Sequence, residues 1–91
     1  MYEIRVTSRF KKDLKAAQEQ GRDLTLLHAV ITKLSNGEML APKYRDHALT
    51  GDWADFRECH IIPDWLLIYK QDKAILILTL VRNGTHSDLF R

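Results

Sequence analysis

A chain of 91 residues can bury about two thirds of the surface it exposes when unfolded and is too short for a second core, so we expect one domain over residues 1–91. Hydrophobic residues make up 45% and charged residues 29%, which excludes disorder, and no apolar run reaches the roughly 18 residues of a membrane span. The net charge of +2, from 14 basic and 12 acidic residues, does not by itself indicate a nucleic-acid-binding protein.

The cysteine usage and the first residues predict a cytoplasmic protein. Cys59 has no second cysteine with which to form an internal disulfide, as is typical of a reducing compartment. The stretch MYEIRVTSRFKK lacks the apolar segment and small-residue cleavage site of a signal peptide. We therefore expect no membrane partner.

The first half of the chain has the pattern of one strand and two helices. Apolar and polar residues alternate over 2–7, as in a half-buried strand. Ser8 can cap a helix over 9–20, whose apolar positions recur one turn apart, and the glycine that follows can end it. Asp23 is expected to cap a second amphipathic helix, which ends at Gly37.

The second half predicts an antiparallel sheet. After a loop at 39–53 come three strand-like runs, at 55–61, 65–70 and 74–82. Because their connections are short, the runs should be consecutive antiparallel strands. The predicted fold is α+β: an N-terminal strand, a helical hairpin and a three-stranded meander, with both helices packed on one sheet face.

The turn IPDW at 62–65 sets the predicted register. Proline and aspartate suit the first and second corners of a tight turn at the end of a sheet. Pairing across this turn and the next would place His60 opposite Leu67, and Leu67 opposite Leu76. On this register the three residues share one sheet face with Arg82.

Several chemically active side chains should gather at this end of the sheet, namely His60, Asp64, Trp65, Arg82 and His86. The last of them follows an expected turn at 83–84. Each alone has a structural explanation, such as a turn former or a core residue. Together, two imidazoles, a carboxylate and a guanidinium supply an acid, a base and a fixed positive charge for chemistry at a phosphate. His and Asp could also bind zinc or manganese, but no tight ligand spacing is present, so a metal ranks second and we expect no metal or other cofactor.

Other polar residues have weaker signals. A basic cluster of Arg9, Lys11, Lys12 and Lys15 could follow phosphates or could be a solvated helix face. His28, in the second helix, is expected to be structural or surface-exposed. Cys59 alternates with His60 and should therefore be a buried residue on the opposite face, not a nucleophile.

Two segments carry a specific series of motifs, YRDHALTGDWADFRECHIIPDWLLIYK at 44–70 and LVRNGTHSDLF at 80–90. A loop histidine precedes L-x-G-x-W, then F-R-x-x-H-I-x-P-D-W follows, and R-x-G-x-H-x-x-L-F ends the series. This series resembles the YafQ branch of the RelE superfamily of toxin–antitoxin systems. The order of strand, helix, helix and three strands matches that family over the whole chain.

The resemblance implies an mRNA interferase, a toxin that enters the A site of the 30S ribosomal subunit and cuts the message there by metal-independent attack of a 2′-OH. Its implied partners are mRNA, the ribosome with its ribosomal RNA, and a cognate antitoxin through which it would reach operator DNA only indirectly. The family's site positions match His47, His60, Asp64, Arg82, His86 and Phe90.

In this interpretation His86, in a mobile tail, is the general acid, because an imidazole titrates near neutral pH. Asp64, with His60, is the base at the 2′-OH. Arg82 would hold the scissile phosphate as a bidentate donor.

The remaining positions would bind substrate. His47 would contact phosphate or orient the nucleotide, and Trp65 or Phe90 would stack on a base. Trp65 could instead belong to the core. The basic cluster would dock on ribosomal RNA.

A binding protein is the alternative to an enzyme. In that case the chain would be a co-repressor subunit with a vestigial site, acting together with its antitoxin. Growth separates the two, since a nuclease arrests cells when induced alone and a binding subunit does not.

Overall fold

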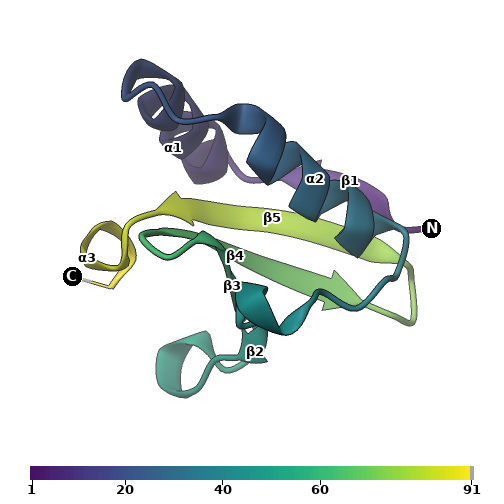
Figure 1. Cartoon of the computed structure of the whole chain (residues 1–91). Helices are drawn as coiled ribbons and strands as arrows, with labels where there is room; N and C mark the ends of the chain where they lie inside the picture. Colours follow the sequence, from purple (N-terminus) through teal and green to yellow (C-terminus); the bar gives the residue numbers. More distant parts are fainter. Residues whose placement is uncertain (91) are drawn as a thin grey trace.

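The computed structural model describes residues 1–90, which form three α-helices, two short 3-10 helices and one five-stranded sheet (Figure 1). The strands are β1 (Glu3–Val6), β2 (His47–Ala48), β3 (Arg57–Ile62), β4 (Trp65–Asp72) and β5 (Ile77–Gly84). The α-helices are α1 (Ser8–Glu19), α2 (Leu24–Ser35) and α3 (His86–Leu89), and the 3-10 helices span Pro42–Tyr44 and Gly51–Trp53. The strand order is β1-β5-β4-β3-β2, with β1 parallel to β5 and the other neighbours antiparallel. The predicted α+β class is confirmed. In this described part, no helix is long and apolar enough to cross a bilayer.

The strand and helical hairpin of the first half form where the sequence predicts them. Thr7, not Ser8, is the N-cap of α1: its hydroxyl accepts a hydrogen bond from the backbone N–H of Phe10 at 3.0 Å and donates one to the carbonyl of Val81 at 2.7 Å. This hydroxyl therefore starts α1 and ties it to β5. Asp23 caps α2 as predicted. The glycines after the two helices have φ of +77° and +76°, the left-handed conformation that ends a helix.

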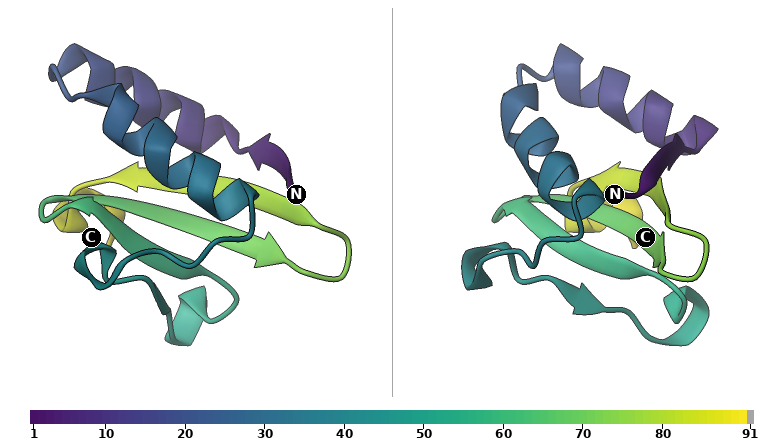
Figure 2. Two further views of the ribbon diagram at one scale, coloured as in Figure 1. Left: turned by 45° about the vertical axis from the view of Figure 1, so that its right-hand side comes forward. Right: turned by 90° about the vertical axis from the view of Figure 1, so that its right-hand side faces the viewer.

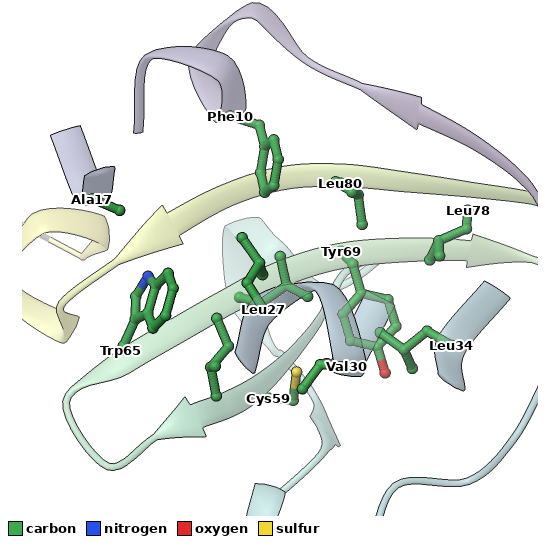
Figure 3. Packing of buried hydrophobic residues seen from close by; sticks show 12 residues of the cluster. Phe10, Ala17, Leu27, Val30, Leu34, Cys59, Trp65, Tyr69, Leu78 and Leu80 are labelled. Carbon is green, nitrogen blue, oxygen red and sulfur yellow. The ribbon is translucent and has the colours of Figure 1, made fainter. Parts of the chain in front are cut away.

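Helices α1 and α2 cover one face of the sheet (Figure 2). The cluster buried between the layers contains Phe10, Ala17, Leu27, Val30 and Leu34 from the helices and Cys59, Ile61, Trp65, Leu67, Tyr69, Leu78 and Leu80 from the strands (Figure 3). Cys59 is fully buried here, and this burial raises the pKa of its thiol to about 12. The prediction that Cys59 is a buried residue is confirmed.

A second, smaller apolar cluster lies on the opposite sheet face. Its buried members are Leu66, Ile68 and Leu89, and its partly buried members are Leu49, Trp53, Phe56, Val81 and Phe90. Part of this cover comes from the segment 39–53, which was predicted to be only a loop. It contains β2, in which His47 pairs with Glu58 of β3, so the sheet extends one strand beyond the predicted meander.

The turn between β4 and β5 is longer than the sequence suggested. The carboxylate of Asp72 accepts hydrogen bonds from the backbone N–H groups of Ala74 and Ile75, at 3.0 and 3.3 Å. Leu76 then adopts a left-handed φ of +55°. Asp72 pairs with Ile77 as a result, and β5 starts at residue 77 instead of residue 74.

The register between β3 and β4 also differs from the prediction. Ile62 pairs with Trp65 as expected, but an irregularity between His60 and Ile62 makes His60 pair with Leu66. His60 and Leu66 consequently share the face away from the helices, whereas Leu67 lies in the helix-side core. The predicted common face of His60 and Leu67 is therefore wrong.

The predicted turn at Asn83 and Gly84 is wrong as well, because both residues continue β5. Asn83 pairs with Leu67, in the place predicted for Leu76. Leu76 lies in the turn before β5, while Arg82 extends toward α1, so these two residues do not share a sheet face either.

Candidate active site

The predicted active residues belong to elements that come together at one end of the sheet, where the turn between β3 and β4 lies beside the end of β5 and the start of α3 (Figure 1). Strand β3 supplies His60, the turn and the start of β4 supply Asp64 and Trp65, β5 supplies Arg82, and α3 supplies His86. Gly84 pairs with Leu66 beside this turn, which confirms the predicted direction of the last strand.

Glu58 links two of the predicted catalytic histidines. This residue is buried, and its Oε1 lies 3.4 Å from Nε2 of His60 and 3.8 Å from Nε2 of His47. His47 reaches this point because β2 pairs it directly with Glu58. Glu58 was not among the predicted site residues, although the period of two in a strand puts it on the same face as His60.

The second ring nitrogen of each histidine faces a backbone oxygen. Nδ1 of His60 lies 3.2 Å from the carbonyl oxygen of Pro63, and Nδ1 of His47 lies 2.6 Å from that of Arg45. Each imidazole therefore lies between a backbone carbonyl and the carboxylate of Glu58.

Arg82 is paired with Asp13 of α1. Its Nε and Nη2 donate to the two carboxylate oxygens of Asp13, each at 3.0 Å, and its Nη1 donates to the carbonyl of Asp88 at 3.4 Å. The hydrogen bonds to Asp13 raise the pKa of Arg82 above its usual value, so the guanidinium remains charged. A surface pocket of about 480 Å³ opens beside the pair.

Asp64 and Trp65 share Arg22 as a neighbour but differ in exposure. Asp64 is exposed in the turn, with its Oδ1 3.7 Å from Nη1 of Arg22, whose guanidinium also lies 5.2 Å from the ring centroid of Trp65. Trp65 is fully buried, its ring directed into the core (Figure 3), and its Nε1–H donates to Oδ1 of Asn83 at 3.2 Å. Because Trp65 exposes no ring face, the prediction that it stacks on a base is wrong, and its core alternative is correct.

Replacing this tryptophan should therefore act on stability. We expect Trp65→Ala to lower the free energy of unfolding by about 3–5 kcal/mol, as measured by urea denaturation of the purified chain. The partly exposed Trp53 provides the matched control, and Trp53→Ala should lose much less. Equal losses from the two variants would contradict a core role for Trp65.

His86 begins α3 beside two aromatic rings. The helix is started by a capping box between Thr85 and Asp88, so His86 lies in an ordered helical turn and not in the predicted mobile tail. The exposed ring of His86 lies 4.9 Å from that of Phe90, and Phe90 contacts the ring of Trp53 edge-on at 5.9 Å. Phe90 and Trp53 are both partly exposed, so they present ring surface on which a base could stack.

The four residues of the basic cluster, Arg9, Lys11, Lys12 and Lys15, are all exposed on α1. Arg9 lies nearest to the predicted site, since it lines the pocket beside Arg82. The other three are exposed on the same helix.

Asp13, Arg22 and Trp53 were not predicted to be near the site. For Trp53 a signal existed, because an aromatic residue follows the loop histidine within the matched motif. Asp13 and Arg22 gave none: they belong to α1 and the turn after it, and only the packing of α1 on the sheet brings them to β5 and β4.

Comparisons with known proteins agree on one family. The family model described as the bacterial toxin of a type II toxin–antitoxin system, YafQ, matches residues 2–91. The mRNA interferase toxin YafQ of Escherichia coli K12 is 40% identical over 90 residues, which cover 97% of this chain and 95% of the relative. A metal-bound toxin from Helicobacter pylori is 49% identical, with a TM-score of 0.93 over 99% of this chain and all of that one.

The YafQ toxin of E. coli has also been solved with its partner, in the DinJ–YafQ toxin–antitoxin complex, where the matched chain is 37% identical with a TM-score of 0.90 over 99% of this chain and 98% of that one. Among residues 1–90 of this chain, no group of three or more His, Cys, Asp or Glu side chains is arranged to hold a metal ion. The match of the family model over nearly the full length, together with identities above one third, shows that this chain belongs to the YafQ family of bacterial toxins of type II toxin–antitoxin systems.

Proposed function

We propose that this chain is an endoribonuclease, an mRNA interferase that cuts messages in the ribosomal A site and so stops translation. The observation that supports this best is the convergence of imidazoles, a guanidinium and an exposed carboxylate at one end of the sheet. The name of the E. coli K12 relative gives the same activity. Because ribosomes are its target, the toxin would act in the cytoplasm.

The proposed reaction uses the 2′-OH of the message as the nucleophile. A base removes the 2′-OH proton, O2′ forms a bond to phosphorus, the bond from phosphorus to O5′ breaks, and an acid protonates the departing O5′. The products are a 2′,3′-cyclic phosphate and a free 5′-OH. All the groups needed are side chains, so the reaction requires no metal or other cofactor.

The acid and the base differ in their surroundings. His86 suits the acid, because its imidazole is exposed at the start of α3 and can approach the leaving oxygen. Asp64 suits the base, because its carboxylate is exposed in the turn, where a 2′-OH can reach it. His60, whose Nδ1 lies 3.2 Å from the carbonyl oxygen of Pro63 in the turn that carries Asp64, would assist Asp64.

The other residues would bind the message. Arg82 would hold the scissile phosphate with the N–H groups that Asp13 does not use. His47, held near Glu58, would contact a neighbouring phosphate. Phe90, with Trp53 beside it, would stack on a base.

A dependence on the ribosome follows from the small net charge of +2. Neutralising phosphates supplies most non-specific affinity for RNA, so this chain should bind naked RNA weakly and gain from a ribosome that presents the message. We expect fast cleavage on translating ribosomes and slow, salt-sensitive cleavage of the same RNA alone, measured by gel assay. Reversing the four charges of the basic cluster should slow the ribosomal reaction by about tenfold or more.

Equal cleavage rates with and without ribosomes would contradict this dependence. An unchanged ribosomal rate after charge reversal would instead show that the basic cluster is only solvated surface. Glu19→Lys on the same helix is the matched control, because it changes the charge outside the cluster.

We also propose that a cognate antitoxin binds and neutralises the chain, as the complex solved for the E. coli relative suggests, and that operator DNA is reached only through that antitoxin. The competing function is that of a co-repressor subunit without nuclease activity. Inducing the chain alone in growing cells separates the two. Growth arrest supports the nuclease, and normal growth with a well-expressed chain supports the co-repressor.

A further inference from the structure

We propose that Asp13 is a positioning residue, which holds the guanidinium of Arg82 in the orientation that receives the scissile phosphate. The inference rests on the proposed function, in which Arg82 contacts that phosphate. Asp13 lies on α1, 69 positions before Arg82, and it belongs neither to the family motifs nor to the residues predicted at this end of the sheet.

The carboxylate of Asp13 accepts hydrogen bonds from three N–H donors. Nε and Nη2 of Arg82 each donate at 3.0 Å, and the backbone N–H of Asn83 donates to Oδ2 of Asp13 at 3.2 Å. Both side chains are largely buried, with 15% of Arg82 and 13% of Asp13 exposed. The carboxylate is thus fixed both to the guanidinium and to the strand that carries it, and it cannot follow Arg82 in other rotamers without breaking the bond to the backbone.

The hydrogen bonds to Asp13 leave part of the Arg82 guanidinium free for substrate. Of its five N–H groups, Asp13 takes two and the carbonyl of Asp88 takes one at a long 3.4 Å. Two N–H groups remain for phosphate oxygens, and Arg82 lines the surface pocket together with Arg9, Asp13 and Asp88. A guanidinium can hold a carboxylate along one edge and a phosphate along another, because its donors lie in one plane.

The benefit of such a device is preorganisation. An unrestrained arginine side chain would lose most of its rotamer freedom on binding the phosphate, and a donor that is slightly displaced stabilises the transition state poorly. The negative charge of Asp13 has the opposite effect, since it weakens the attraction of the site for an anion. Positioning and charge neutralisation therefore predict opposite changes in rate when Asp13 loses its charge.

Steady-state cleavage of a ribosome-bound message shows whether the rate falls or rises when Asp13 loses its charge. We expect Asp13→Asn, which keeps the shape but cannot accept from both guanidinium nitrogens, to lower kcat by roughly 10- to 100-fold with little change in KM. Glu19→Gln, an exposed carboxylate on the same helix, should cleave within about twofold of the original chain. Cleavage by Asp13→Asn at or above the original rate would overturn the proposal.

Restoration of cleavage by added guanidinium ion distinguishes positioning by Asp13 from a purely structural role of Asp13. In Arg82→Ala, millimolar guanidinium should partly restore cleavage, because Asp13 can bind the free ion where the side chain was. The double variant Asp13→Asn/Arg82→Ala, which lacks both members of the ion pair and leaves no unpaired buried charge, should not be restored. Equal restoration in both variants would overturn positioning by Asp13.

The same variants separate this inference from the proposed function. Arg82→Ala with full activity would remove the phosphate role of Arg82, and Asp13 would have nothing to position. Slow cleavage by Arg82→Ala with full activity of Asp13→Asn would overturn the role of Asp13 alone.

Discussion

A His86→Ala variant is expected to lose growth arrest when it is induced alone and to cleave ribosome-bound message roughly 100- to 10,000-fold more slowly, the range that a general acid contributes. His86 is exposed at the start of α3, and its contact is with the ring of Phe90. The capping box between Thr85 and Asp88 does not involve the imidazole. The fold should therefore remain, with an unchanged urea midpoint.

His28 provides the matched control for this loss. It is an exposed histidine on α2, where it lines an apolar groove between the two helices, on the side of the sheet away from the paired His47 and His60. His28→Ala should arrest growth as the original chain does. Arrest that persists in His86→Ala and disappears in His28→Ala would show that the active site lies at the groove between α1 and α2 and not at the end of the sheet.

The first half of the fold was predictable because its signals are local. Asp23 caps α2 by a bond to a backbone N–H two residues away, and the glycines after both helices adopt the φ that ends a helix. Even the error at Thr7 is small, since a hydroxyl one position earlier performs the same capping. What the sequence did not reveal is that this hydroxyl also bonds to Val81, 74 positions later.

The register of β5 was not predictable in the same way. Its start depends on a carboxylate of Asp72 that bonds to two backbone N–H groups and on a left-handed Leu76, a conformation that leucine rarely adopts. A hydrophobic run that begins at Ala74 gives no sign of either. The apolar residues continue through the turn, so the sequence places the start of β5 too early and shifts every predicted pair between β4 and β5.

The candidate site shows the same division between local and long-range signals. The motif residues His60, Asp64 and His86 lie near one end of the sheet as expected, since short connections fix the strand direction. Glu58 could have been found from the alternation of β3. Asp13 could not, because its place beside Arg82 depends on how α1 packs against β5.

The largest loss of cleavage should come from blocking one group of the substrate, the 2′-OH. With side chains alone as acid and base, the nucleophile within reach is the 2′-OH next to the scissile phosphate, held in line by the ribosome and the protein. A metal-assisted nuclease would activate water instead and would be indifferent to that hydroxyl. The question is pertinent because a metal-bound toxin from H. pylori is among the relatives.

A chelator also distinguishes attack by the 2′-OH without a metal from metal-assisted attack by water. Cleavage should continue when trace divalent metals are removed under conditions that keep the ribosome complex assembled. Loss of cleavage on chelation, restored by adding one transition metal, would indicate a metal-dependent reaction.

The most direct measurement is cleavage of a ribosome-bound message that carries a single 2′-O-methyl group at the cut position, compared with the unmodified message. The proposed mechanism predicts no cleavage of the methylated message, and a 2′,3′-cyclic phosphate or 3′-phosphate with a free 5′-OH from the unmodified one. Full cleavage of the methylated message, or recovery of a 5′-phosphate end, would show that water is the attacking nucleophile and would contradict the mechanism.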